Sequence, residues 1–400
     1  MEEWKTYKLS EIGTVVGGAT PSTKVAENYD GDIPWITPKD LSNFSGRFIE
    51  HGERNITQQG FDSCSCQMLP KDSVLFSSRA PIGYVAIAAV PLCTNQGFKS
   101  VIPNEKIVDP RFLYYLLKFN KERIAEMGSG TTFMEVSGGV MKNVEVCLPE
   151  LTVQKRAAEI LSSIDDKIEL NNRINHNLEE QAKALYKSWF VDFEPFKDGE
   201  FVDSELGMIP EGWHIGTLSE IADITMGQSP SGSSFNEDGH GIVFYQGRTE
   251  FGFRFPSIKL FTTEPTRFAE PHSVLMSVRA PVGDINVALD RCCIGRGLAA
   301  ITAKDEAFSF VLYTLKGKSS ELDLYNGEGT VFGSINRKDL EGLSVLIPPM
   351  SIIQQFNDCI RPIDESIAIA CKEIVNLSFS RDSLLPRLMS GQLSFDECDC

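Results

Sequence analysis

Two stretches of the chain, about two hundred residues apart, carry the same long repeat. The first, residues 152–192, reads TVQKRAAEILSSIDDKIELNNRINHNLEEQAKALYKSWFVD and contains no Pro or Gly. Its seam positions recur at alternating spacings of four and three residues, which is typical of a helix that lies along another helix. These positions are Ile164, Ile168, Asn171, Asn175, Leu178, Ala182, Leu185 and Trp189.

The seam returns 199 residues later at Ile363, Ile367, Ala370, Ile374, Leu377, Arg381, Leu384 and Leu388. A helix of about forty residues spans roughly 60 Å, more than a compact domain needs internally. We therefore predict two long helices, over residues 151–192 and 350–391, that pack on each other as a spacer. The alternative is that each is an ordinary amphipathic helix packed on the core of its own domain. Asn171 and Asn175 would lower the stability of the pair and set its register.

The segments that precede the two helices also repeat. WKTYKLSEIGTVVGGATPS near the N-terminus aligns with WHIGTLSEIADITMGQSPS after residue 212, and VLFSSRAPIG aligns with VLMSVRAPVG. Further on, GTTF is matched by GTVF. Self-similarity with a period near 200 residues indicates an internal duplication.

Each repeat, residues 1–150 and 213–349, contains short runs of Val, Ile and Phe between breaks rich in Gly, Pro and Asn. This pattern is typical of many short strands with few helices. We predict an α+β fold in which two duplicated globular α/β domains are separated by the two long helices. Residues 193–212 are expected to connect the first helix to the second domain, and residues 392–400 to form an acidic tail.

The net charge of −17 argues against a protein that binds nucleic acid without partners, because such proteins are usually basic. Two segments nevertheless contain more basic than acidic side chains. Residues 71–123 contain eight Lys or Arg against four Asp or Glu, and residues 248–296 contain seven against five. If the chain binds DNA, we expect partners to supply much of the charge that neutralises the phosphates.

Composition also narrows the class of protein. No apolar run approaches the ~18 residues needed to cross a bilayer, and the N-terminal residues lack the basic and apolar regions of a secretory leader. The 10 cysteines include no C-x-x-C and no zinc-ligand spacing. We expect a soluble cytoplasmic protein with reduced, inert thiols, no metal site and no membrane partner.

Catalytic signatures are missing. Gly317-Lys318-Ser319 resembles the end of a phosphate loop, but Leu312 stands where its first Gly is required. There is no G-x-S-x-G, no H-E-x-x-H and no G-x-G-x-x-G after a strand. The one Pro-Pro follows Ile347, not the Asn or Asp of an adenine methyltransferase pocket, and the five His are scattered. We predict no catalytic residue in this chain.

Polar and basic side chains on loops remain as binding candidates. ITPKDLSNFSGRF at residues 36–48 mixes such side chains with aromatics, as a loop that reaches base edges would, and its counterpart YQGRTEFGFRF at 245–255 differs. The Arg of each R-A-P-[IV]-G turn could pair with a phosphate or brace its turn against a carboxylate. For every candidate, the alternative is an ordinary surface loop. The candidate DNA contacts are Lys39, Asn43, Ser45, Arg47, Arg79, Lys99, Thr131, Thr132, Arg248, Thr249, Arg254, Arg279 and Arg296.

A family resemblance rests on WITPKDL at residues 35–41, the two LSEI starts, the RAPIG and RAPVG turns, LEEQAKALYKSWFVDFEPF at 178–196, and LLPRLMSGQL near the end. Over essentially all 400 residues the chain resembles the specificity subunit of a type I restriction-modification system. The resemblance implies two target-recognition domains held apart by an antiparallel coiled coil, each domain reading one half of a bipartite double-stranded DNA target.

The resemblance also implies partners that perform the chemistry. Two methyltransferase subunits would dock on the helices and restriction/translocase subunits would join them, so S-adenosylmethionine, ATP and Mg are expected on partners and no cofactor on this chain. Half-sites on one face of a duplex lie about one turn, ~34 Å, apart, a separation that the inferred rod can hold. Arg381 stands where the first helix has Ala182, and the second helix lacks SWFVDFEPF, so equivalence of the two docking sites stays open.

Two other classes of function remain. One is a protein scaffold whose duplicated domains bind protein partners and not DNA. The other is an autonomous DNA methyltransferase or nuclease whose motifs differ from known ones.

Overall fold

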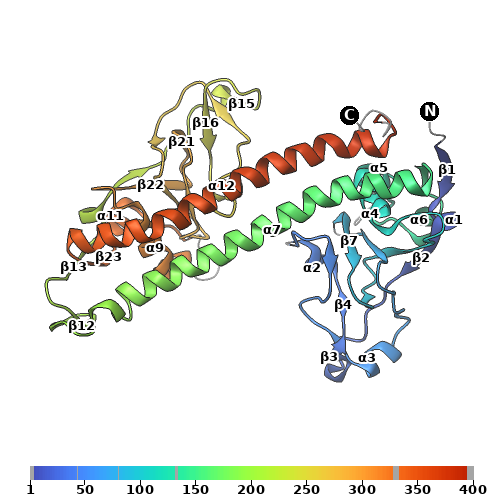
Figure 1. Ribbon diagram of the computed structural model, residues 1–400, viewed down its shortest axis with the longest axis horizontal. Coiled ribbons are helices and arrows are strands. Elements are labelled where there is room, and N and C mark those ends of the chain that lie inside the picture. Colours follow the sequence, from blue (N-terminus) through green and yellow to red (C-terminus); the bar gives the residue numbers. More distant parts are fainter. Residues whose placement is uncertain (1–3, 43, 80, 131–133, 328–332, 394–400) are drawn as a thin grey trace. The chain divides into compact units, whose positions relative to one another are not determined.

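The computed structural model describes residues 4–42, 44–79, 81–130, 134–327 and 333–393 (Figure 1). Its internal contacts divide the chain into two compact units. Unit 1 comprises Met1–Leu170 with Val375–Cys400, and unit 2 comprises Asn171–Ile374. Each unit therefore contains one sequence repeat together with part of each long helix.

Unit 1 contains a five-stranded sheet in the order β2-β9-β6-β7-β5 and two smaller pairs, β1-β10 and β4-β8. The sheet is antiparallel except where β5 joins β7. The strands are β1 (Lys5–Lys8), β2 (Gly13–Gly17), β3 (Tyr29–Ile33), β4 (Trp35–Ile36), β5 (Phe48–Ile49), β6 (Val74–Ser78), β7 (Ile82–Ala88), β8 (Cys93–Thr94), β9 (Lys99–Pro103) and β10 (Glu145–Leu148).

Helices cover this sheet and bury its apolar side chains. They are α1 (Leu9–Ile12), α2 (Pro38–Ser42), α3 (Gln58–Asp62), α4 (Pro110–Phe119), α5 (Lys121–Glu126) and α6 (Gly138–Lys142), with the first part of α7 (Leu151–Phe190). α4 begins at Pro110 because the Asp109 carboxylate accepts hydrogen bonds from the backbone N–H of Arg111 and Phe112 at 2.9 and 3.1 Å. Its buried face joins Leu161 of α7 and Leu388 in one hydrophobic core.

Unit 2 repeats this plan with different sheet membership. One sheet has the order β14-β22-β19-β20, another has the order β15-β17-β16-β21-β18, and β13 pairs with β23. The strands are β13 (His214–Thr217), β14 (Ala222–Met226), β15 (Phe235–Asn236), β16 (Ile242–Tyr245), β17 (Phe261–Thr262), β18 (Phe268–Ala269), β19 (Val274–Ser277), β20 (Ile285–Val287), β21 (Cys292–Ile294), β22 (Leu298–Ala303) and β23 (Ser344–Ile347).

The helices of unit 2 are α8 (Leu218–Ile221), α9 (Phe308–Gly317), α10 (Ser319–Asp323), α11 (Arg337–Glu341) and the first part of α12 (Met350–Met389). Their core contains an aromatic group in which Phe190 of α7 meets Phe356 of α12 at 4.8 Å and Phe310 of α9 at 5.0 Å between ring centroids. The predicted connector also has structure of its own, since β11 (Phe201–Ser204) and β12 (Gly207–Pro210) form a hairpin.

The two long helices are observed as Leu151–Phe190 and Met350–Met389, against predicted ranges of 151–192 and 350–391 (Figure 1). In unit 2, Asn171 donates to Glu373 and Asn175 donates to Cys371, so residue numbers rise along α7 while they fall along α12. The predicted antiparallel pairing is confirmed.

All seam positions are buried or half-buried. Those buried are Ile168, Asn171, Asn175, Ala182, Ile367, Ala370 and Leu388, and those half-buried are Ile164, Leu178, Leu185, Trp189, Ile363, Ile374, Leu377, Arg381 and Leu384.

The long helices pack on the domain cores as well as on each other. Each of the two interpretations of the sequence, a helix pair and amphipathic helices packed on domain cores, therefore describes part of the structure. The start of α7 joins the core of unit 1, whereas its end, at Ala182 and Phe190, joins the core of unit 2. Because α7 is divided in this way, the boundaries between the two compact units fall within the long helices, after Leu170 and after Ile374, and not near residues 150 and 350.

Two expectations about class can be compared with the described residues. Among them, no helix combines the length and the apolar character needed to span a bilayer. Their cysteines are all unpaired: Cys64, Cys66, Cys93, Cys147, Cys292, Cys293, Cys359 and Cys371.

Candidate nucleic-acid interface

Three predicted basic residues of unit 2 stand on neighbouring turns, and all three are exposed. Arg279 follows β19, Arg296 lies between β21 and β22, and Arg248 begins the short 3-10 helix η4 (Arg248–Glu250) after β16. The strands that carry these turns are short: β19 and β21 are buried throughout, and β16 is buried at the end that leads into its turn.

Backbone hydrogen bonds hold these turns together. The Val278 N–H donates to the Gly297 carbonyl at 2.9 Å, and the Gly295 N–H donates to the Tyr245 carbonyl at 2.8 Å. A Cβ atom at Gly227 would lie 2.2 Å from the Gly295 carbonyl oxygen, so the turn after β14 packs against the same group. The arginines therefore project from one connected set of turns.

The charges on these turns are incompletely balanced. Arg248 pairs with Asp284, and both side chains are 45% exposed. Neither Arg279 nor Arg296 forms an ion pair with any residue in the described ranges. An exposed pair contributes only ~0–1 kcal/mol, so a phosphate can replace Asp284 at little cost. Thr249, also exposed, donates its hydroxyl to Glu250 at 2.7 Å.

The matching turns of unit 1 carry a carboxylate. The Lys99 Nζ lies 3.2 Å from one oxygen of Glu135, and an Nη atom of Arg79 lies 4.0 Å from the other. The Arg79 side chain is 35% exposed, whereas the Lys99 side chain is 15% exposed. Two cations share one carboxylate here, so the turn retains a net positive charge and Arg79 braces the turn while remaining accessible.

The two units differ at the position that faces this arginine. Arg79 forms an isolated β-bridge with Glu135, and Arg279 forms the corresponding bridge with Ser334. Because serine carries no charge, Arg279 is the stronger candidate for a phosphate contact.

The remaining candidates of unit 1 are exposed or lie outside the described residues. Lys39 and Ser45 are exposed. The ammonium of Lys39 lies 2.7 Å from Glu53, and this hydrogen bond raises the pKa of the lysine. Asn43, Thr131 and Thr132 fall outside the described residues.

Two predicted contacts are buried. Arg47 is 4% exposed and Arg254 is 2% exposed, and both guanidinium groups pair with carboxylates of the long helices. In this conformation neither can reach a base edge or a phosphate. Arg47 and Arg254 therefore do not belong with the exposed candidates. The prediction for Arg47 and Arg254 was wrong because the sequence shows the composition of a loop but not which of its side chains are buried.

Thr20 and Gln96, which the sequence did not single out, hydrogen-bond to each other through their side chains across two turns of unit 1. A Cβ atom at Gly18 would lie 2.1 Å from the Asn95 carbonyl oxygen, so these turns are in close contact. In the sequence, the turn that carries Thr20 belongs to the repeated segments GGATPS and MGQSPS.

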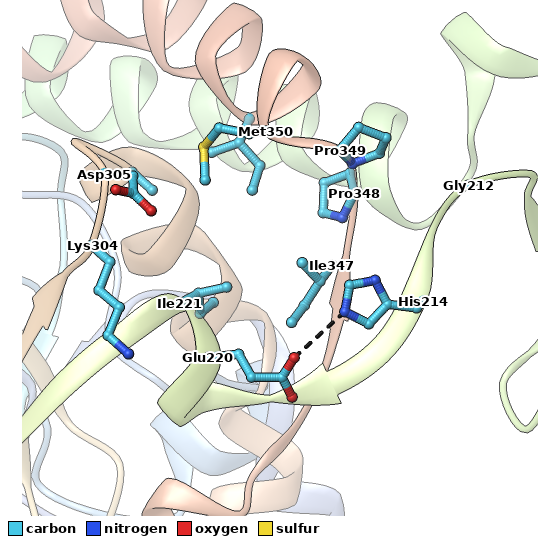
Figure 2. Close-up of a pocket in the computed structure, with 12 residues that line it drawn as sticks. Gly212, His214, Glu220, Ile221, Lys304, Asp305, Ile347, Pro348, Pro349 and Met350 are labelled. Atoms are coloured by element: carbon cyan, nitrogen blue, oxygen red, sulfur yellow. Dashed lines mark ion pairs between the residues drawn. The ribbon is translucent and has the colours of Figure 1, made fainter.

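A cavity of about 340 Å³ lies at the start of α12 in unit 2 (Figure 2). Its lining includes His214 and Glu220, whose Nε2 and Oε2 atoms are 3.5 Å apart, together with Lys304 and Met350. The backbone N–H of Thr217 lowers the pKa of Glu220. None of the predicted site residues that the structure describes lines this cavity.

Comparisons with known proteins agree with the duplication. Residues 1–180 and 210–377 match the family described as type I restriction modification DNA specificity domain. The chain is 36% identical to the type I restriction enzyme MjaIX specificity subunit of Methanocaldococcus jannaschii, over 99% of this chain and 95% of that protein. It is 34% identical to the putative type I restriction enzyme MjaX specificity subunit of the same organism, over 98% and 94%.

A solved structure supports the fold. The S subunit of a type I restriction-modification system from M. genitalium matches with a TM-score of 0.63 and 16% identity, over 97% of this chain and 96% of that chain. At this identity the likeness concerns the fold alone.

Proposed function

The chain belongs to the type I restriction modification DNA specificity family, and from this premise we propose that its two repeats read the two halves of a split double-stranded DNA target. The specificity subunit is the non-catalytic component of such systems, and catalysis lies on partner subunits. The absence of catalytic motifs from the sequence is consistent with this division.

The proposal is supported above all by equivalent turns that present different side chains. Both repeats expose an arginine in a RAP[IV]G turn, Arg79 or Arg279, whereas the reading loops differ in sequence and in structure. A constant scaffold with variable exposed loops is what two different half-sites require.

We assign two roles to the described candidates other than Arg47 and Arg254. Those on the variable loops contact base edges, where amide, hydroxyl and guanidinium groups discriminate between bases in the major groove. Those on the repeated turns contact phosphates and set the register without reading sequence. The base-reading candidates are Lys39, Ser45, Arg248 and Thr249, and the phosphate candidates are Arg79, Lys99, Arg279 and Arg296. Asn43, Thr131 and Thr132, which lie outside the described residues, remain candidates for DNA contact without an assigned role.

The organisation proposed for the assembly follows from the same premise. Residues 1–150 and 213–349 are the recognition domains, and the helices of residues 151–192 and 350–391 form the spacer on which two methyltransferase subunits dock. Restriction/translocase subunits join this core. S-adenosylmethionine, ATP and Mg act on those partners, and the complex works on DNA in the cytoplasm.

Co-expression with its methyltransferase subunit, followed by genome-wide mapping of N6-methyladenine, tests this function. We expect a split motif that is methylated only when this chain is present. Exchanging residues 1–150 for those of a relative should change one half of the motif and leave the other. A co-purified complex that neither binds nor methylates DNA would favour the protein scaffold.

Single substitutions test the phosphate assignment. Arg279→Met should weaken DNA binding equally for all sequences and reduce the slope of log K against log salt by about 0.9. Arg291→Met is the matched control, because Arg291 in the same unit is already held 3.0 Å from Glu270. An unchanged slope in the Arg279 variant would exclude the contact.

A further inference from the structure

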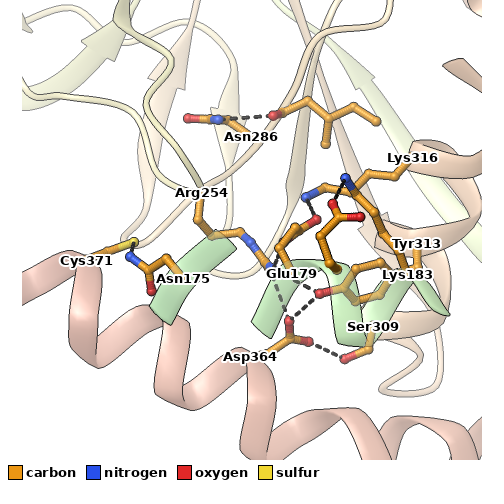
Figure 3. Close-up of polar contacts among 12 residues, drawn as sticks. Asn175, Glu179, Lys183, Arg254, Asn286, Ser309, Tyr313, Lys316, Asp364 and Cys371 are labelled. Atoms are coloured by element: carbon orange, nitrogen blue, oxygen red, sulfur yellow. Dashed lines mark hydrogen bonds and ion pairs between the residues drawn. The ribbon is translucent and has the colours of Figure 1, made fainter. Parts of the chain in front are cut away.

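Arg254 connects the second recognition domain to both long helices of unit 2 (Figure 3). One Nη atom donates to Asp364 of α12 at 2.7 Å. The other pairs with Glu179 of α7 and donates to the Tyr313 hydroxyl at 2.9 Å. One guanidinium therefore joins a domain loop, both helices and α9.

Side chains of α9 complete this network. The Tyr313 hydroxyl donates to Asp364 at 3.1 Å, and the Ser309 hydroxyl donates to the other oxygen of Asp364 at 2.6 Å. Lys316 pairs with Glu179, which is 4% exposed. Two cations of the domain thus balance two carboxylates, one from each helix.

Unit 1 has a related arrangement around Arg47. Its Nε atom lies 3.0 Å from Glu169, and an Nη atom pairs with Asp166, so both partners belong to α7. The Arg47 backbone N–H also donates to Glu169 at 3.1 Å. The loop that carries Lys39 and Ser45 is therefore held to α7 at its end, by Arg47.

The two arginines occupy the same place in the repeats. The Ile87 N–H donates to the Arg47 carbonyl at 2.7 Å, and the Val287 N–H donates to the Arg254 carbonyl at 2.9 Å. Ile87 and Val287 are separated by the same 200 positions as the RAPIG and RAPVG turns. The equivalence was hidden in the sequence because the loops before the arginines differ in length.

The α4 and α9 tyrosines are equivalent as well. The Tyr115 hydroxyl donates to Asp165 of α7 at 2.7 Å, as Tyr313 does to Asp364, and the tyrosines and the carboxylates are offset by 198 and 199 residues. In unit 1 the second helix supplies a cation, because Arg381 of α12 lies 2.9 Å from Asp165.

We propose that Arg254, and Arg47 in the other repeat, are positioning residues that fix the reading loop of each recognition domain on the long helices. The inference rests on the proposed function. A buried guanidinium whose two Nη atoms bind three different groups, as in Arg254, can make these contacts in few geometries, whereas an apolar contact tolerates sliding. Buried ion networks add little net stability, so specificity of arrangement is the role that suits them here.

Arg254 is well placed to act on DNA reading because it ends the loop that begins with Arg248 and Thr249. Those two side chains are exposed, while Arg254, six residues after Arg248, is buried against α7 and α12. A shift at Arg254 is therefore transmitted to the exposed side chains through a short stretch of backbone.

The test uses the complete methyltransferase complex and duplexes in which one half-site is already methylated, so that each adenine is scored alone. Arg254→Met should lower kcat at the half-site read by residues 213–349 by between about 10- and 100-fold, because a misplacement of ~1 Å costs that much. We expect KM for DNA to change little and the other half-site to keep its rate. Arg47→Met should show the reverse preference.

Two further variants separate positioning from folding. Arg254→Lys retains the charge but loses the planar fork, so it should fold and lose rate at the same half-site to a smaller degree. Arg291→Met, which removes an exposed pair in the same domain, should leave both half-sites unchanged. Thermal melting of each complex reports the folded fraction.

The outcomes are distinct. Equal loss at both half-sites, in proportion to the folded fraction, would overturn the positioning role, and so would wild-type rates at both half-sites in Arg254→Met and Arg254→Lys. Failure of the unsubstituted complex to methylate any split motif would instead overturn the proposed function, and the inference with it.

Discussion

Replacing Asn175 by Leu is expected to stabilise unit 2. The side chain is fully buried in the helix seam. Among the described residues its Oδ1 atom has no hydrogen-bond partner, and its Nδ2 atom donates only to the Cys371 sulfur at 3.4 Å. Sulfur is a weak acceptor. A buried unsatisfied polar atom costs about 1–3 kcal/mol, which Leu of similar volume removes. We expect the free energy of unfolding to rise by that amount.

Asn171→Leu is the matched comparison, because this residue lies one seam position away and is also buried. Its Nδ2 atom donates to the Glu373 carboxylate at 2.8 Å. A hydrogen bond to a charged group is worth about 1.5–3 kcal/mol, so N171L should be less stable than the unsubstituted chain by about that amount, and therefore further still below N175L.

Calorimetry of the full chain measures both variants. A unit of this size shifts its midpoint by about 2–4 °C per kcal/mol, so the unit 2 transition of N175L should rise by between about 2 and 12 °C. A lower midpoint for N175L, or equal midpoints for the two variants, would refute the reasoning that the unpaired amide oxygen dominates.

Three further substitutions probe the core, the turns and the buried charges. Phe356→Ala should lower the free energy of unfolding by about 3–5 kcal/mol in urea titration, since its aromatic neighbours cannot fill the cavity. Gly227→Ala should cost roughly 1–3 kcal/mol, because its Cβ would lie 2.2 Å from a carbonyl oxygen, and should weaken reading of one half-site. Burial alone would raise the pKa of Glu179, but Arg254 and Lys316 lower it below its usual value. Its contribution is therefore present above the unfolded pKa of about 4.3 and lost as pH falls through the folded value, so Glu179→Gln should flatten stability against pH in that acid range.

Each of these predictions has a control. Phe379 is 75% exposed, so Phe379→Ala should change stability by less than about 0.5 kcal/mol. Gly232→Ala should be tolerated because an added Cβ there meets nothing within 4 Å. Glu180→Gln, at an exposed carboxylate paired with Lys183, should leave the acid dependence of stability nearly intact. Equal effects within any pair would contradict the corresponding prediction.

Much of the site could not be predicted, for a physical reason. Sequence composition marked the loops at residues 36–48 and 245–255 as rich in polar and basic groups, and it correctly singled out exposed residues such as Arg248. Whether an arginine is exposed depends on what lies across from it. For Arg47 the partners are 119 and 122 residues away, a separation that no local pattern reports.

The amino-acid sequence by itself determined the duplication, the two long helices and their seam. These are properties of spacing: a four-three repeat places side chains on one face whatever surrounds the helix, and a 199-residue offset is visible without coordinates. Only the tertiary structure decided that the second half of α7 packs on the second repeat and that Arg254 joins the helices and not the solvent. Both outcomes depend on burial between segments distant in the chain, where packing and charge balance, not local pattern, select the arrangement.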